Sequence, residues 1–82
     1  MEREKIGSIR FPKKGITLRY YLLFSRKDGY GLEVEQEENG VRTSEVCSPI
    51  AAEREIVLNL GREICRGVVF PGYLAEIVED QL

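Results

Sequence analysis

The segment from Ile16 to Ser25, ITLRYYLLFS, constrains the fold more than any other part of the chain. Its side chains alternate at a period of two residues, which is typical of a β-strand with one well-buried face. The face predicted to be buried carries Ile16, Leu18, Tyr20, Leu22 and Phe24. The sequence therefore predicts a strand that other elements must cover on this side.

A second strand follows, in which Tyr30, Leu32 and Val34 alternate with the glutamates at 33, 35 and 37. We expect the glutamate face to point to water, as an ordinary solvated strand surface.

The pairing of these two strands can be predicted from the turn between them. A three-residue loop, 27–29, places Phe24 opposite Leu32 and Arg19 opposite Glu37. A two-residue loop would shift the pairing by one residue and exchange the two faces of a strand.

Asn39-Gly40 is a hairpin signal that predicts a third strand, Val41–Cys47. A short edge strand at Ile6–Phe11 would make a fourth. The expected fold is α+β: an antiparallel β-meander of three or four strands, followed by two C-terminal helices packed on one face. Residues 1–82 should form a single domain.

The helical period begins after Ser48, which is a suitable N-cap, with Pro49 at the first helical position. Gly67 suits the C′ position, and Gly61 within the helix suggests close packing. Pro71 can start a second helix that runs to the C-terminus.

Several classes of function find little support in the composition. The chain has no histidine, which removes the usual base of a nucleophilic triad, and it has no phosphate-binding glycine loop. Cys47 and Cys65 lack metal-ligand spacing and are expected to be buried and reduced. The acidic residues at 76, 79 and 80 are expected to be a solvated helix face. We therefore expect no enzyme activity, no cofactor and no metal.

No stretch approaches the ~20 apolar residues that span a bilayer, and the first residues lack the apolar region of a signal peptide. We expect a cytoplasmic protein that is not bound to a membrane.

The second face of the first predicted strand carries Tyr21 and Leu23 beside Arg19. Helices on one side of the sheet would leave this patch in water, where an apolar patch flanked by charge is typical of a protein interface. The preferred interpretation is a non-catalytic module that binds another protein or itself through Arg19, Tyr21 and Leu23.

The alternative is a nucleic-acid-binding module. Residues 1–30 carry eight Lys and Arg against three Asp and Glu, whereas residues 31–82 carry four against eleven. Lys13, Lys14, Arg26 and Lys27 would contact phosphates. The simpler interpretation of the charge asymmetry is that the two halves neutralise each other across the fold.

Three short motifs resemble those of a small family of uncharacterised proteins from Firmicutes. In that family a YYL strand precedes a YGIxIE strand, and the last helix ends in a DVVED-like motif. The matching residues here are Tyr20–Leu22 for the first motif and Ile77–Asp80 for the third, with Glu76 in place of an aspartate. Those of the second motif are Tyr30, Gly31, Leu32, Val34 and Glu35. The resemblance implies a bacterial cytoplasmic origin and names no activity.

Overall fold

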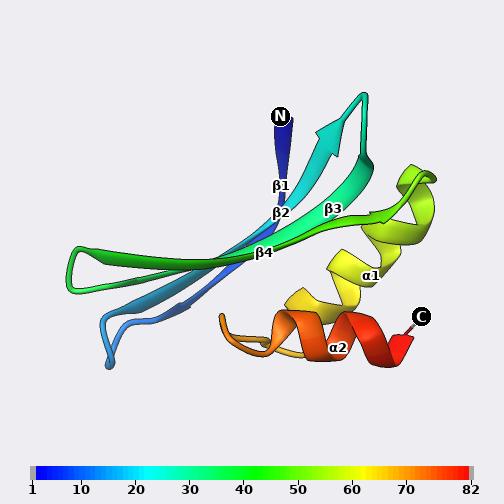
Figure 1. Ribbon diagram of the computed structural model, residues 1–82. Coiled ribbons are helices and arrows are strands. Elements are labelled where there is room, and N and C mark those ends of the chain that lie inside the picture. Colours follow the sequence, from blue (N-terminus) through cyan, green and yellow to red (C-terminus); the bar gives the residue numbers. More distant parts are fainter. Residues whose placement is uncertain (1, 82) are drawn as a thin grey trace.

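The computed structural model describes residues 2–81 as an antiparallel four-stranded sheet followed by two helices (Figure 1). The strands lie side by side in chain order: β1 (Glu2–Phe11), β2 (Ile16–Ser25), β3 (Gly29–Glu38) and β4 (Val41–Ala51). The helices are α1 (Arg54–Arg66) and α2 (Leu74–Gln81). The α+β class and the antiparallel sheet are confirmed. The optional fourth strand exists and begins at Glu2 instead of Ile6, so β1 and β4 form the two edges.

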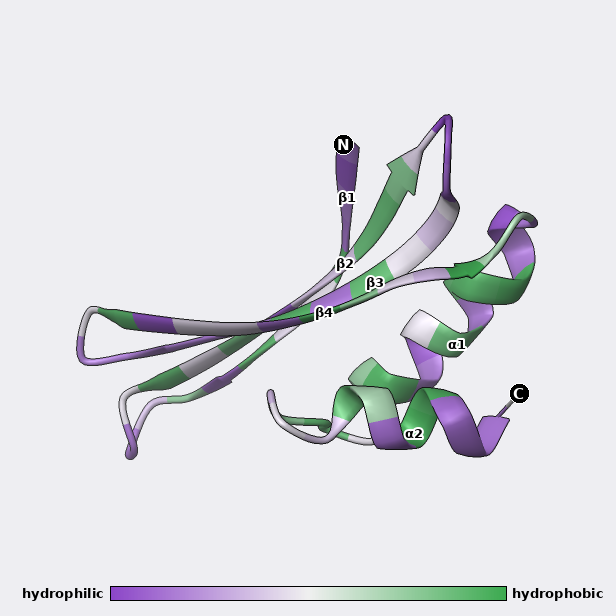
Figure 2. Cartoon of the chain, in the orientation of Figure 1, coloured by the Kyte–Doolittle hydropathy of each residue, from purple (hydrophilic) through white to green (hydrophobic). Residues whose placement is uncertain are grey.

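Side chains from the sheet and from both helices share one hydrophobic cluster. Its members are Leu18, Tyr20, Leu22, Leu32 and Val34 from the strands, and Val57, Leu58, Leu60, Ile64, Val69, Leu74 and Val78 from the helical part. Figure 2 shows hydrophobic segments in the strands and in both helices, while the start of β1 and the end of α2 are hydrophilic. The alternation in β2 thus selects the residues of the core.

Tyr20 links the sheet to the segment between the helices. Its side chain is completely buried, and its hydroxyl donates a 2.9 Å hydrogen bond to the carbonyl of Val69. Burial raises the pKa of Tyr20 to about 12, so the hydroxyl stays protonated as a donor.

Gly61 packs closely, as predicted. A Cβ at this position would meet the side chain of Ile6 and lie 2.9 Å from Cδ2 of Leu32. The glycine therefore lets α1 approach β1 and β3.

The predicted pairing of β2 with β3 is wrong by two residues. Phe24 lies opposite Tyr30, and Arg19 lies opposite Glu35. A shift of two residues leaves every side chain on its predicted face, so the apolar alternation does not distinguish the two registers. The difference lies in the turn, because Gly29 adopts a positive φ of 89° as the first residue of β3.

The predicted start of the first helix is also wrong. Ser48 and Pro49 continue β4, and α1 begins at Arg54 after the N-cap Glu53, which makes no side-chain cap bond. A proline is tolerated here because β4 is an edge strand, where one side of the backbone needs no ladder hydrogen bonds.

The end of α1 follows a Schellman pattern. The N–H of Val69 bonds to the carbonyl of Ile64, and the N–H of Val68 bonds to that of Cys65. Gly67 was expected to take the left-handed conformation, but its φ is −82°, whereas Val68 has a φ of 57°. A β-branched residue in this conformation is strained.

The second helix begins at Leu74 and not at Pro71. Its first turn is capped by Glu45 from β4, whose carboxylate accepts hydrogen bonds from the N–H groups of Gly72, Leu74 and Ala75 at 2.7, 2.8 and 3.1 Å. Burial opposes ionisation, but these bonds outweigh it and lower the pKa of Glu45. A side chain distant in sequence therefore decides where α2 starts.

Candidate functional site

The predicted interaction residues Tyr21 and Leu23 are not exposed. Their relative exposures are 9% and 3%, although neither belongs to the main hydrophobic cluster. The Arg3 guanidinium lies 4.0 Å from the centroid of the Tyr21 ring and covers it. Leu23 is paired with Arg3 on one side and Gly31 on the other. The expected apolar patch is therefore not exposed, and Arg3 covers the Tyr21 ring within it.

Arg19, the third predicted interaction residue, lies in a charged ladder on this open face of the sheet. One guanidinium nitrogen donates to Glu35 at 3.1 Å and to Glu37 at 2.9 Å. Arg3 pairs with Glu33 at 3.1 Å in the same way. The glutamates expected to face water are thus partly buried, and Glu35 is only 8% exposed. The ladder joins the basic and acidic halves of the chain, as the charge distribution predicted.

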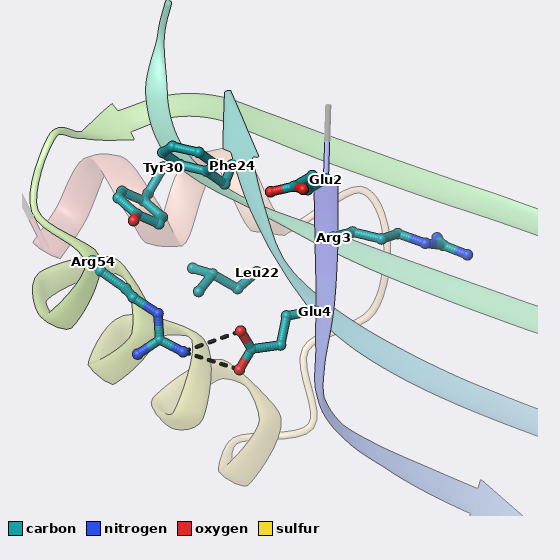
Figure 3. A pocket seen from close by; sticks show the side chains of 7 residues that line it. All are labelled: Glu2, Arg3, Glu4, Leu22, Phe24, Tyr30 and Arg54. Carbon is teal, nitrogen blue, oxygen red and sulfur yellow. Dashed lines mark hydrogen bonds and ion pairs between the residues drawn. The ribbon is translucent and has the colours of Figure 1, made fainter. Parts of the chain in front are cut away.

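A cleft of about 600 Å³ lies on the other face of the sheet, beside the N-terminal end of α1 (Figure 3). We call it the sheet-end cleft; its lining residues are Glu2, Arg3, Glu4, Leu22, Phe24, Tyr30 and Arg54. The rings of Phe24 and Tyr30 are 4.8 Å apart between centroids. Figure 3 shows Arg54 reaching from the helix toward Glu4, while Arg3 points away.

The ion pair of Arg54 with Glu4 spans this cleft. One guanidinium nitrogen lies 3.1 and 3.0 Å from the two carboxylate oxygens. The hydrogen bond to Glu4 raises the pKa of Arg54, so the guanidinium remains charged at neutral pH. The cleft therefore combines a pair of aromatic rings with one ion pair between a strand and a helix.

A second hollow lies between α1 and α2. Two adjoining cavities of about 320 and 330 Å³ share Gly67, Val69 and Ile77. We call the combined depression the inter-helix groove; its other lining residues are Leu60, Glu63, Ile64, Val68, Phe70, Tyr73, Glu76 and Gln81. Most of these side chains are apolar, so the groove is a surface that a partner could cover.

Exposed apolar side chains continue from the groove. Val68 and Tyr73 at one end are 36% and 61% exposed. Ile56 is 47% exposed and stands one helical turn before Leu60 on α1. Sequence reasoning missed this surface, although the run from Val68 to Phe70 and the isolated Tyr73 between two helices were visible signals.

The charged side chains that line the groove are acidic. Glu63 comes from α1 and Glu76 from α2, and both are exposed. Neither forms an ion pair with another residue between positions 2 and 81. The groove therefore has a negative rim over an apolar floor.

The four basic residues proposed to bind nucleic acid lie in two separate turns. Lys13 and Lys14 precede β2, whereas Arg26 and Lys27 follow it. A strand of ten residues separates the pairs by roughly 30 Å. The fold does not bring them into one patch.

Both cysteines are free thiols, but they are half-buried and not fully buried as expected. Burial raises the pKa of each thiol, so the neutral form predominates near neutral pH. Within residues 2–81, no group of three or more metal-ligating side chains is close enough to hold an ion. No helix in the same range is long and apolar enough to cross a membrane. The cytoplasmic location stays a prediction.

These features describe a small α+β protein with a ladder of ion pairs on one face of its sheet, a sheet-end cleft and an inter-helix groove. Residues 9–82 match the model of a family of unknown function, DUF6514, and the chain belongs to that family. No curated protein and no solved structure matches it significantly. The resemblance to a family of unknown function agrees with this match, whereas the origin in Firmicutes stays a prediction.

Proposed function

We propose that this chain is a non-catalytic module that binds another protein through the inter-helix groove. The observation that carries the proposal is the run of apolar lining residues that extends to the exposed side chains of Ile56, Val68 and Tyr73. Exposed apolar surface continuous with a depression is characteristic of docking sites. This surface replaces the Tyr21 and Leu23 patch, because both of those side chains are buried.

The proposal takes α1 and α2 as a layer over one face of the sheet. The shared hydrophobic cluster supports this arrangement, since Val57 and Ile64 of α1 and Val78 of α2 belong to it. The groove would then lie on the outer side of that layer, where a partner can reach it.

The rim charges define the chemistry of the partner. Glu63 and Glu76 have no cationic partner within residues 2–81. A segment with apolar side chains flanked by lysine or arginine would cover the floor and pair with both carboxylates. We therefore propose a basic amphipathic segment of a partner protein, and not an acidic one, as the occupant.

Fluorescence anisotropy with a labelled short amphipathic peptide of leucine and lysine tests the proposal. The replacement Glu76→Lys should weaken binding by about tenfold, because an attraction becomes a repulsion. Tyr73→Ser should also weaken binding by removing apolar contact area. The matched control is Glu38→Lys, which makes the same charge change at the exposed end of β3.

Equal losses for Glu76→Lys and Glu38→Lys would show that the peptide senses only net charge and would overturn the groove. Unchanged binding by Tyr73→Ser would remove the apolar part of the site. A peptide of leucine and glutamate should bind far less tightly than the basic one.

A further inference from the structure

The outer edge of β4 has properties that suit pairing with another strand. Val41 and Val46 are 66% and 54% exposed, which places two of the most exposed large apolar side chains on this one strand. The segment 41–47 begins directly after the Asn39-Gly40 turn, and Pro49 follows it. In Figure 1 the turn end of the β3–β4 hairpin extends beyond both helices. The part of β4 next to the turn can therefore be approached from its outer edge.

Pairing between two copies of one strand obeys a simple rule. An antiparallel pair with two-fold symmetry has its axis perpendicular to the sheet, so paired residues lie on the same face. Side chains alternate between faces, so two residues share a face only when they are an even number of positions apart. The two-fold axis must therefore pass through a residue and not between two residues. The central residue then meets its own copy.

A register centred on Ser44 is compatible with the side chains of β4. It places Val41 opposite Cys47 and Arg42 opposite Val46 of the second copy. Thr43 and Glu45 face each other in the same way, and no like charges meet. In the single chain the Arg42 guanidinium lies 3.6 Å from the Glu37 carboxylate. In the pair it can keep this contact while the aliphatic part of the Arg42 side chain covers the exposed Val46 of the other copy.

The first residues of β1, at positions 2–5, cannot pair in this symmetric way with a second copy. Glu2 and Glu4 lie on the cleft face, and Arg3 and Lys5 lie on the open face. Every two-fold register centred within 2–5 therefore sets a carboxylate against a carboxylate or a cation against a cation. Like charges directly opposite each other destabilise a strand pair. Charge complementarity thus permits pairing at β4 and excludes it at the first residues of β1.

We infer that two copies of this chain associate through their β4 edges, centred on Ser44, into a continuous antiparallel sheet. The inference concerns a different surface from the inter-helix groove. Each association can therefore fail while the other holds.

Sedimentation velocity over a concentration series tests the inference. The unmodified chain should show a monomer–dimer equilibrium, and Ser44→Lys should raise the dissociation constant by at least about tenfold, because two lysines would meet on the axis. The control is Ser8→Lys, the same change at an exposed residue of the β1 edge, which should leave the equilibrium unchanged. A monomer at every concentration, or equal effects of the two variants, would overturn the inference.

A cysteine on the axis supplies a second test. Directly opposed residues of antiparallel strands have Cα atoms about 4.5–5.5 Å apart, within the range of a disulfide. Under mild oxidation Ser44→Cys should give a covalent dimer rapidly, and Ser8→Cys should not. Equal yields would contradict the register. Peptide binding in the groove should survive Ser44→Lys, which separates the two proposals.

Discussion

The two edges of the sheet protect their unpaired backbones in different ways. The first residues of β1, Glu2–Lys5, alternate in charge, so water and self-repulsion keep other strands away. The segment 41–47 of the edge strand β4 carries two charged residues among hydroxyl, thiol and valine side chains, and its Glu45 bonds to the first turn of α2. One edge is thus defended by charge, whereas the other is joined to a helix and leaves a segment free to pair. The proposed self-association would therefore use the edge whose pairing sets no like charges against each other.

The pairing of each edge strand with its neighbour has an irregularity at a glycine, which is Gly7 in β1 and Gly31 in β3 opposite β4. Substitutions at these two glycines should show the largest difference in the free energy of unfolding. Gly31→Ala should destabilise the fold by about 2–3 kcal/mol, because the new Cβ would collide with Ser48 and lie 2.7 Å from the carbonyl oxygen of Cys47. Backbone on an adjacent strand moves little, so the cost cannot be relaxed away. Chemical denaturation would measure it.

Gly7→Ala is the matched change at the β1 edge. Its Cβ would lie 2.9 Å from the sulfur of Cys65, which can rotate aside, so the loss should stay below about 1 kcal/mol. Equal losses at the two positions would show that the edges are held equally tightly.

Removing one carboxylate from each edge, Glu45 from β4 and Glu4 from β1, should give a smaller difference in the free energy of unfolding. Glu45→Ala should cost about 1–2 kcal/mol, since it removes the cap of α2. Glu4→Ala breaks an ion pair whose partners are 41% and 62% exposed, and should cost less than about 1 kcal/mol. Unfolding free energies of the two variants give the comparison, and a greater loss at Glu4 would contradict it.

The effect of Glu45 depends on pH with a defined sign. The pKa of this carboxyl is lowered in the folded state from its ordinary value of 4.5. Its contribution is therefore complete above that value and is lost as the pH falls through the lower folded pKa. The difference in unfolding free energy between the unmodified chain and Glu45→Gln should shrink between about pH 7 and pH 3. An equal difference at both ends would exclude the charged cap.

The smallest change in the free energy of unfolding is expected for a substitution at Val68, which lies between the two helices. Its φ of 57° is unfavourable for a β-branched residue, so Val68→Gly should stabilise the fold by up to about 1 kcal/mol. The same change removes an exposed apolar side chain from the groove and should weaken binding of the basic peptide. A variant that is less stable, or that binds more tightly, would contradict the role assigned to Val68.

The sequence predicted the elements better than it predicted the surfaces. The alternation of β2 identified Leu18, Tyr20 and Leu22 as core residues, and all three are buried. The same alternation could not reveal that Arg3 folds over Tyr21, because β1 begins with charged residues that have no apolar pattern. The inter-helix groove was missed for a similar reason, since it forms only when α1 and α2 lie next to each other.

Local chemistry by itself determined the order of strands and helices along the chain, which face of β2 enters the core, and where the β3–β4 hairpin turns, because these depend on neighbouring residues. Tertiary structure decided the continuation of β4 through Pro49 and the start of α2 at Leu74. It also decided that Tyr21 and Leu23 are covered. Each of these outcomes depends on contacts between residues far apart in the chain, such as Glu45 with α2 and Arg3 with Tyr21. Local patterns along the chain do not specify such contacts.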